Sequence, residues 1–124
     1  NLLNNACKYA PKESVIHMDA RLVQTFDNLP ENAPPHTIVP CLLISVIDEG
    51  KGISEADINQ IFLPFYRTRD AQARQIDGSG LGLAISRSLA ELQRGKLWAS
   101  VATEDEPGGR FYFTLPENDI LNPQ

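Results

Sequence analysis

The sequence predicts a single α+β domain, and three observations support this. The chain has 124 residues, enough for one modest hydrophobic core and too few for two domains. Residues 41–47 are almost all apolar, as in a central strand, and residues 96–103 and 110–115 are predicted to form an antiparallel hairpin around a turn at 106–109. A glycine-rich loop, Gly78-Ser79-Gly80-Leu81-Gly82-Leu83, runs directly into a segment with the apolar spacing of a helix.

The composition is that of an ordinary soluble globular protein, with 42% hydrophobic and 22% charged residues. The net charge of −5 argues against nucleic acid or an anionic membrane as the partner. No apolar run is long enough to span a membrane, and no signal-peptide pattern opens the chain. Cys7 and Cys41 lack metal-ligand spacing, so we interpret both as buried thiols. We therefore expect a cytoplasmic domain that makes no membrane contact of its own.

The first ten residues are predicted to form a helix that ends before Pro11. Asn1, Asn5 and Lys8 share one face of this helix at helical spacing. Two amides and an ammonium group can bind a hydrated cation and an anionic oxygen together, which suits a Mg²⁺–triphosphate. The alternative is a solvated polar face, and the poor helix propensity of asparagine argues mildly against it.

The next stretch is predicted to contain one strand and one long loop. Residues 15–26 alternate in polarity and are rich in β-branched residues, which predicts a strand, and the proline-rich residues 27–40 predict a loop. His17 falls in the strand and His36 in the loop. Neither histidine has a plausible partner nearby, so we interpret both as structural.

Asp48-Glu49-Gly50-Lys51-Gly52-Ile53 follows the predicted central strand. A carboxylate at the end of a buried strand can accept a hydrogen bond from an amine, and Gly50 and Gly52 would let a flat ring approach the backbone. The alternative is a simple turn before a helix. Ser54 is a good N-cap, and residues 56–61 are predicted to continue as a short helix that Pro64 ends.

The loop at residues 78–83 has the features of an anion site, because a helix that begins at a glycine-rich loop presents free N–H groups and its positive dipole end. The polar residues before it exclude a dinucleotide-binding fingerprint, and the lack of a following Gly-Lys-Ser/Thr excludes a P-loop. Arg67, Arg69 and Arg74 precede the loop. They predict either a lid that closes over an anionic ligand or a solvated surface loop.

Taken together, these segments resemble the ATP-binding domain of sensor histidine kinases in the GHKL superfamily. Residues 1–9 resemble the N box, 48–53 the first glycine box, 62–67 the F box and 78–83 the second glycine box. Residues 108–116 are similar to the usual closing strand. The four boxes stand in the family's order and cover the chain from end to end, which makes the resemblance far more specific than any single box.

The resemblance implies a two-layer α/β sandwich, with a mixed, largely antiparallel sheet backed by helices and an ATP lid. The catalytic domain would span residues 1–116, truncated at the N box, and residues 117–124 would be a C-terminal tail. It would position Mg²⁺-ATP for phosphoryl transfer to a histidine on a separate dimerisation hairpin of the homodimeric parent kinase. A response regulator would be the downstream partner, and the parent kinase could be membrane-anchored.

The resemblance also assigns roles to residues, although it implies no catalytic side chain in the chain itself. Asn5 would ligate Mg²⁺, Asn1 would help to hold the metal and phosphates, and Asp48 would take the exocyclic amine of adenine. The phenylalanines would hinge the lid, and the glycines of the second glycine box would offer N–H groups to the phosphates. The full set implied for the ATP site is Asn1, Asn5, Lys8, Tyr9, Asp48, Gly50, Gly52, Ile53, Phe62, Phe65, Arg67, Gly78, Ser79, Gly80, Leu81, Gly82 and Leu83.

The residue at position 1 distinguishes the alternative functions of this superfamily, and here it is Asn1. In GHKL ATPases such as gyrase B subunits and mismatch-repair proteins, a glutamate at this position activates water, and an amide cannot act as a general base. Anti-sigma-factor serine kinases resemble the glutamate-bearing pattern as well. Because the family's phosphoacceptor histidine is absent from this chain, a non-catalytic adenine-nucleotide-binding module also stays open.

Overall fold

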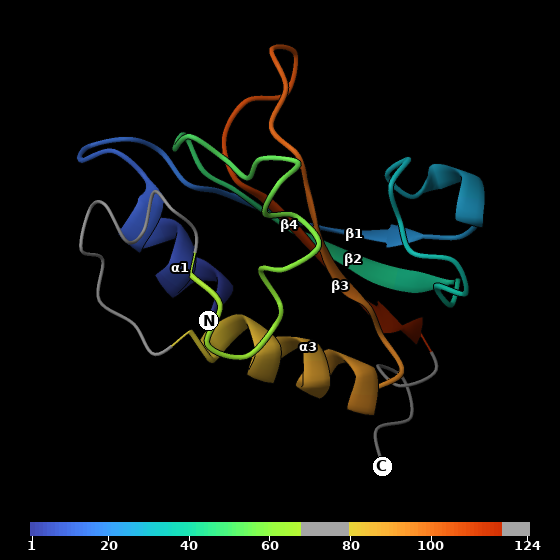
Figure 1. The fold of residues 1–124 in the computed structure, drawn as a ribbon. Helices are drawn as coiled ribbons and strands as arrows, with labels where there is room; N and C mark the ends of the chain where they lie inside the picture. Colours follow the sequence, from blue (N-terminus) through green and yellow to red (C-terminus); the bar gives the residue numbers. More distant parts are fainter. Residues whose placement is uncertain (68–79, 118–124) are drawn as a thin grey trace.

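The computed structural model describes residues 1–67 and 80–117, and within these residues the chain forms two layers, a four-stranded antiparallel sheet and a pair of helices on one of its faces (Figure 1). This arrangement confirms the predicted α+β class. Strand pairing in the named strands is antiparallel, and an isolated bridge between Ile53 and Val101 is parallel. The elements in chain order are α1 (Leu2–Tyr9), β1 (His17–Val23), a 3₁₀ helix (Phe26–Asn28), β2 (Cys41–Ile47), α3 (Gly82–Leu92), β3 (Leu97–Ser100) and β4 (Arg110–Pro116).

The strand order is β1-β2-β4-β3, so β2 and β4 form the middle of the sheet. Leu42 of β2 lies opposite Leu22 of β1 on one side and opposite Leu115 of β4 on the other. The nearly continuous apolar run of β2 is explained by this central position. Because β2 is fixed from both sides, the residue that follows it, Asp48, is held at a defined edge of the sheet.

The sheet face that lies away from the helices carries its own hydrophobic core. Side chains alternate along each strand, and the members on this face pack beneath the long loop that follows β1. Trp98 stacks on Tyr112 with ring centroids 5.5 Å apart, and its indole N–H donates to Asn32 Oδ1 at 3.2 Å. The buried members of this cluster are Val23, Leu29, Cys41, Leu43, Trp98 and Tyr112.

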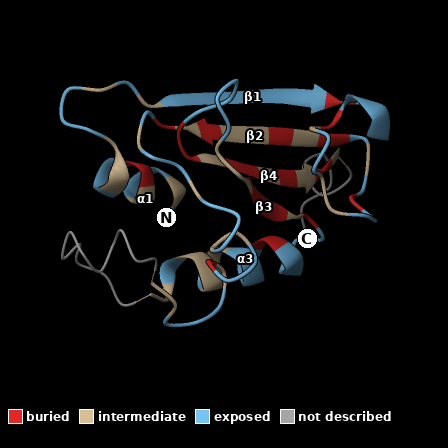
Figure 2. Ribbon diagram, turned by 45° about the horizontal axis from the view of Figure 1, so that its top comes forward, coloured by how far each residue is buried: buried red, intermediate tan, exposed pale blue. Residues whose placement is uncertain are grey.

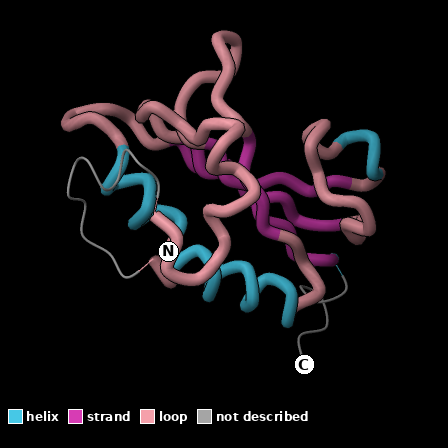
Figure 3. Tube along the Cα trace, viewed as in Figure 1, coloured by secondary structure: helices cyan, strands magenta, loops and turns pink. Residues whose placement is uncertain are grey.

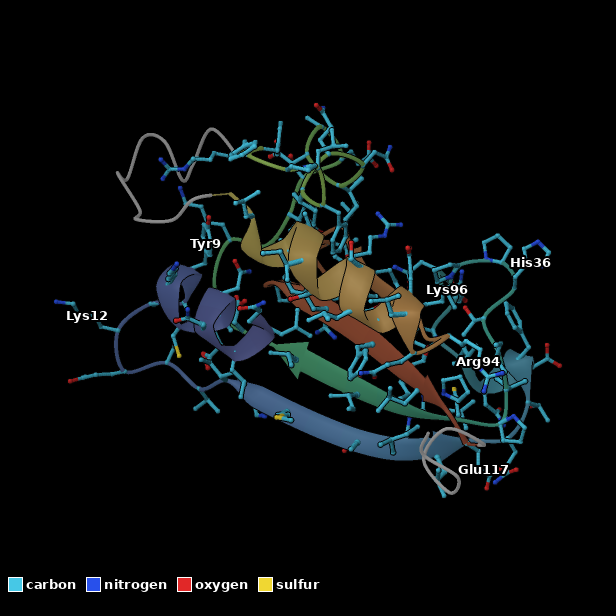
Figure 4. The ribbon with its side chains drawn as sticks, turned by 90° about the horizontal axis from the view of Figure 1, so that it is seen from below. Tyr9, Lys12, His36, Arg94, Lys96 and Glu117 are labelled. Carbon is cyan, nitrogen blue, oxygen red and sulfur yellow. The ribbon has the colours of Figure 1, made fainter. Side chains whose placement is uncertain are left out.

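The other face carries the helices. Its buried cluster is formed by Ile61, Ala99 and Phe111, and Leu2 of α1 and Leu83 of α3 pack against it. Figure 4 shows α3 in front of the central strands and α1 beside the end of β2, with β1 at the lower edge of the sheet, where neither helix covers it.

Strand β1 is exposed along most of its length (Figure 2). Met18 and Leu22 are 59% and 58% exposed on the helix-bearing face. Apolar side chains of α3 are exposed as well, namely Ile85, Leu89 and Leu92. In the described residues, α1 and α3 thus cover the sheet only in part.

The C-terminal end of α3 is closed by Arg94-Gly95, as predicted. The left-handed residue is Arg94, with φ of 63°, and the N–H of Gly95 donates to Ala90 O at 2.8 Å. A Cβ at Gly95 would collide with the carbonyl oxygen of Thr114. Gly95 is therefore needed because it lets the end of the helix approach β4.

Four expectations from the sequence were wrong. The strand predicted at residues 96–103 is confined to Leu97–Ser100, because the chain then turns to Ile53, to which Val101 is bridged and Ala102 N–H donates at 3.0 Å. The strand predicted at residues 15–26 is confined to His17–Val23, because the chain folds back through turns in which Leu29 N–H donates to Phe26 O. Residues 54–61 form consecutive turns instead of a helix, and they are drawn as loop in Figure 3. Cys7 is exposed, because Ala6 is the buried residue of α1, whereas Cys41 is buried as expected.

Among the described residues, no helix has the length and apolar character needed to cross a membrane.

Candidate functional site

A cavity of about 430 Å³ opens between the end of α1, the loop after β2 and the start of α3. Its volume lies within the range of small-molecule sites, roughly 300–1,000 Å³. The walls come from all of the predicted boxes that the structure describes except the F box. The lining residues are Asn5, Tyr9, Asp48, Lys51, Gly52, Ile53, Ser54, Asp57, Ile61, Leu83, Ala102, Gly109 and Phe111.

Asp48 is the buried acidic residue of this cavity, and its side chain is held in one orientation. It is only 5% exposed, and its Oδ1 accepts hydrogen bonds from the N–H of Gly50 at 2.7 Å and of Gly109 at 3.1 Å. Its own N–H donates to Gly109 O at 2.9 Å. Both of these N–H groups bind Oδ1, and a carboxylate with two oxygens has further acceptor capacity for a ligand amine.

Glycines surround Asp48 because nothing larger fits there. A Cβ at Gly109 would collide with the Asp48 carboxylate, and one at Gly108 would collide with the Asp48 backbone carbonyl. Gly108 also has φ of +87°, which other residues rarely adopt. From the sequence alone, Gly108-Gly109 was predicted only as part of a turn and a closing strand. A pair of glycines ahead of a strand was the available signal, and nothing in the sequence linked it to Asp48.

The first glycine box lies against the end of α1. A Cβ at Gly50 would lie 2.8 Å from the carbonyl oxygen of Tyr9, so Gly50 lets the two segments touch. Tyr9 and Asn5 both line the cavity, which brings the N box and the first glycine box together. Lys8 is exposed and does not line the cavity in this structure.

Asn1 lies outside the cavity, at the start of α1, and its side chain reaches α3. Its amide Nδ2 donates to Ser86 Oγ at 2.8 Å and to Gly82 O at 3.4 Å. The first turns of the two helices are joined by these contacts.

The F box packs beside the cavity without lining it. Phe62 meets Phe111 edge to face, with centroids 6.4 Å apart, and the guanidinium of Arg87 lies 4.8 Å from the centroid of Phe62. Phe65 is 70% exposed, with φ of 66°, and its N–H donates to Gly80 O at 2.8 Å. The F box is thereby attached both to the core and to Gly80 of the second glycine box, and its role as a hinge stays a prediction.

The second glycine box is described from Gly80 onward. Gly80 has φ of +78° and passes close to the backbone of Phe65. Leu81 is the N-cap residue of α3, Gly82 begins the helix, and Leu83 lines the cavity. Gly78, Ser79, Arg69 and Arg74 lie outside the described residues, and Arg67 is half-buried just before them. The lid and its arginines therefore stay predictions.

Several lining residues were missed by the sequence analysis. Asp57 accepts hydrogen bonds from Tyr66 O–H at 2.5 Å and from Ser54 Oγ at 3.1 Å. Ile61 and Phe111 form part of an apolar wall. These side chains look like ordinary turn and core residues in the sequence, and they reach the cavity only through the tertiary fold.

The side chains that line the cavity are suited to a metal ion that is already bound to a phosphate ligand. Among the described residues, no group of three or more His, Cys, Asp or Glu side chains could hold a metal ion. Asn5 offers an amide oxygen at the cavity wall, and Mg²⁺ keeps several of its waters and readily takes phosphate oxygens. The residues present fit a hydrated Mg²⁺ bound by a nucleotide.

Comparison with known proteins identifies the family. Residues 1–119 match the family described as histidine kinase-, DNA gyrase B-, and HSP90-like ATPase, and the chain belongs to it. The chain is 39% identical over 123 residues to the autoinducer 2 sensor kinase/phosphatase LuxQ of Vibrio cholerae, covering 99% of this chain and 13% of that protein. It is 32% identical over 116 residues to the sensor histidine kinase WalK of Bacillus subtilis, covering 94% of this chain and 16% of that protein. The chain thus spans less than a fifth of either relative.

The solved structures lead to the same class of protein. The catalytic domain of histidine kinase ThkA aligns with a TM-score of 0.65 at 25% identity, over 94% of this chain and 62% of that one. The mycobacterial sensor histidine kinase MprB aligns with a TM-score of 0.64 at 26% identity, over 93% and 64%. Full-length ShkA, solved in complex with AMPPNP, shares the fold with a TM-score of 0.62 over 92% of this chain and 19% of that one. The predicted resemblance to the ATP-binding domain of sensor histidine kinases is confirmed.

Proposed function

We propose that this chain binds Mg²⁺-ATP and presents its γ-phosphate to a histidine on a separate dimerisation hairpin of a sensor histidine kinase. A response regulator would then receive the phosphoryl group. The family supports adenine-nucleotide binding, and the names of the relatives support two-component signalling.

The observation that carries the proposal is the orientation of Asp48. The buried carboxylate of Asp48 lines the cavity, its Oδ1 is fixed by two backbone N–H groups, and it has acceptor capacity left for a ligand donor. The exocyclic amine of adenine is a suitable donor, and the apolar wall near Ile53 would lie beside the ring. Asp48 would thereby bind and orient the base.

Phosphates would lie toward the start of α3, where the first-turn N–H groups and the helix dipole favour anions. Asn5 would hold the metal through its amide oxygen, and Asn1 would lie nearby at the start of α1. When bound, Mg²⁺ would neutralise phosphate charge. The chain's own residues would bind and orient the nucleotide.

Transfer is favoured over hydrolysis because Asn1 occupies the place of a water-activating carboxylate, and an amide cannot take a proton from water. The proposal is tested by incubating labelled ATP and Mg²⁺ with the protein and with the histidine-bearing hairpin of the same kinase. We expect acid-labile, base-stable label on the hairpin. Rapid phosphate release without the hairpin, or a stable serine phosphate on another protein, would refute the proposal.

A further inference from the structure

We infer that Ser86 is a positioning residue for Asn1, and that it thereby tunes the binding of the metal–triphosphate part of the nucleotide. The inference rests on the proposed function. It concerns a residue of α3 that lies outside all four predicted boxes and was assigned no role from the sequence.

The contact joins two helices across the phosphate end of the candidate site. Nδ2 of Asn1 donates to Ser86 Oγ at 2.8 Å and approaches Gly82 O at 3.4 Å. Gly82 and Ser86 are four residues apart on α3, so the two acceptors lie on the same side of the helix, one turn apart. The amide of Asn1 is placed against both of them.

This pairing fixes which way the amide points. A backbone carbonyl can only accept a hydrogen bond, so the nitrogen of the Asn1 amide must face Gly82 O. The hydroxyl of Ser86 accepts from the same nitrogen. Oδ1 of Asn1 is therefore turned away from α3 and is left as an acceptor for a metal-bound water beside the cavity.

The contact also sets the spacing between the two elements that would hold the phosphates. Asn5, the predicted metal ligand, lies one turn after Asn1, and its N–H donates to Asn1 O at 2.9 Å. The N-terminus of α3 is the anion-binding end of the other helix. The side chain of Asn1 thus links the helix that would hold the metal to the helix that would hold the phosphates.

The hydrogen bond is exposed to solvent, so it adds little to folding stability. Asn1 also makes no side-chain cap for α1, so removing its side chain does not uncap the helix. A loss of function at Ser86 can therefore be separated from a loss of fold.

The experiment measures nucleotide affinity by calorimetry for the protein at its natural full length, with Mg²⁺-AMPPNP and with Mg²⁺-free ADP. We expect Ser86→Ala to weaken Mg²⁺-AMPPNP binding about 3- to 10-fold, which is the effect of one oriented hydrogen bond, and to change ADP binding less than about 2-fold. Ser86→Thr keeps the hydroxyl and should restore wild-type affinity. Ser88→Ala, on an exposed position of the same helix, should have no effect on either nucleotide.

A double-mutant cycle with Asn1→Ala tests the mechanism. If Ser86 acts through Asn1, the double variant binds Mg²⁺-AMPPNP no more weakly than Asn1→Ala alone. Melting temperatures of all variants should stay within about 3 °C of wild type.

Three results would overturn the inference: an equal loss of affinity for both nucleotides, no loss of affinity in Ser86→Ala, or additive effects in the double variant. If wild type binds neither nucleotide, the proposed function fails instead. If Ser86→Ala does not fold, the outcome is decided by two results: wild-type affinity in Ser86→Thr and a selective loss of Mg²⁺-AMPPNP binding in Asn1→Ala.

Discussion

The N–H of Gly109 donates a hydrogen bond to Asp48 Oδ1 at 3.1 Å, across 61 positions of the chain. The contact ties the start of β4 to the end of β2, and Asp48 N–H returns a bond to Gly109 O at 2.9 Å. A carboxylate held in this way loses little rotamer freedom when a ligand binds. The fold therefore orients Asp48 in advance for the nucleotide binding proposed above.

The first prediction is that Asp48→Asn weakens adenine-nucleotide binding by about 1.5–3 kcal/mol, because a charge-assisted hydrogen bond is lost. The amide oxygen can keep the bonds to Gly50 and Gly109, which then turns the NH₂ group toward the donor amine of adenine. Calorimetry measures the change, with Asp19→Asn on the exposed part of β1 as the control. Wild-type affinity in a folded Asp48→Asn protein would remove Asp48 from the site.

The second prediction concerns the glycine that touches Asp48. Gly109→Ala should lower the free energy of unfolding by about 1–3 kcal/mol and weaken nucleotide binding, because the new methyl group collides with the carboxylate. Gly82→Ala is the matched control for stability, since a Cβ there meets no atom within 4 Å. At the first position of α3 this change should leave the free energy of unfolding unchanged or raise it by less than about 1 kcal/mol. Urea unfolding measures both values, and equal effects of the two alanines would contradict the prediction.

The framework of the fold could be predicted from the sequence because it depends on local patterns. The apolar run of β2 and the helical spacing of α3 both predicted elements that the structure contains. The gathering of lining residues at the cavity could not be predicted from local pattern. Asp57 and Phe111 meet there only because the loop after β2 folds over β4, and no spacing along the chain reports such a contact.

Errors arose where tertiary contacts override local propensity. Residues 54–61 keep the helix-start contact between the Ser54 hydroxyl and the Asp57 side chain, but the hydroxyl of Tyr66 donates to the other carboxylate oxygen of Asp57 from outside the segment. The segment consequently follows the cavity wall as a series of turns. Cys7 was predicted to be buried because cysteine usually is, but it lies on an exposed side of α1.

The third prediction uses the buried thiol of Cys41. Burial raises the pKa of Cys41, and the nearby Arg21 guanidinium lowers it by a smaller amount. Because the pKa is higher in the folded state, this group's contribution to stability is complete below the ordinary thiol value of 9.0 and is lost as the pH rises through the folded value. The free energy of unfolding of wild type should fall more steeply above pH 9 than that of Cys41→Val. Parallel pH dependences of the two proteins would contradict this.

The fourth prediction contrasts two leucines. Leu43 is 1% exposed in the centre of the sheet, and Leu92 is 80% exposed at the end of α3. Leu43→Ala should cost about 2–5 kcal/mol of unfolding free energy, because it removes buried contacts and leaves a cavity. Leu92→Ala should change it by less than about 0.5 kcal/mol. Chemical unfolding compares them directly, and a large cost at Leu92 would show that a further segment covers this face.

The last prediction is that the chain alone binds ATP, hydrolyses it negligibly and carries no phosphoryl group on its own residues. The placement of its two histidines gives the physical reason. His17 lies on the same face of β1 as Val23, which belongs to the core away from the helices. His36 belongs to the loop over that core and lies far from Tyr9 at the cavity (Figure 4).

Transfer requires an acceptor nitrogen in line with the γ-phosphate, and the sheet separates both histidines from the cavity in the same molecule. Asn1 supplies no general base for water. Labelled ATP incubated with this chain and Mg²⁺ should therefore leave no acid-labile label on it, and phosphate release should stay at the level of buffer. A His17→Gln, His36→Gln variant controls for direct labelling and should behave as wild type. If wild type is labelled and this variant is not, one of the two histidines is a phosphoacceptor. The γ-phosphate would then have to be accessible from the opposite face of the sheet.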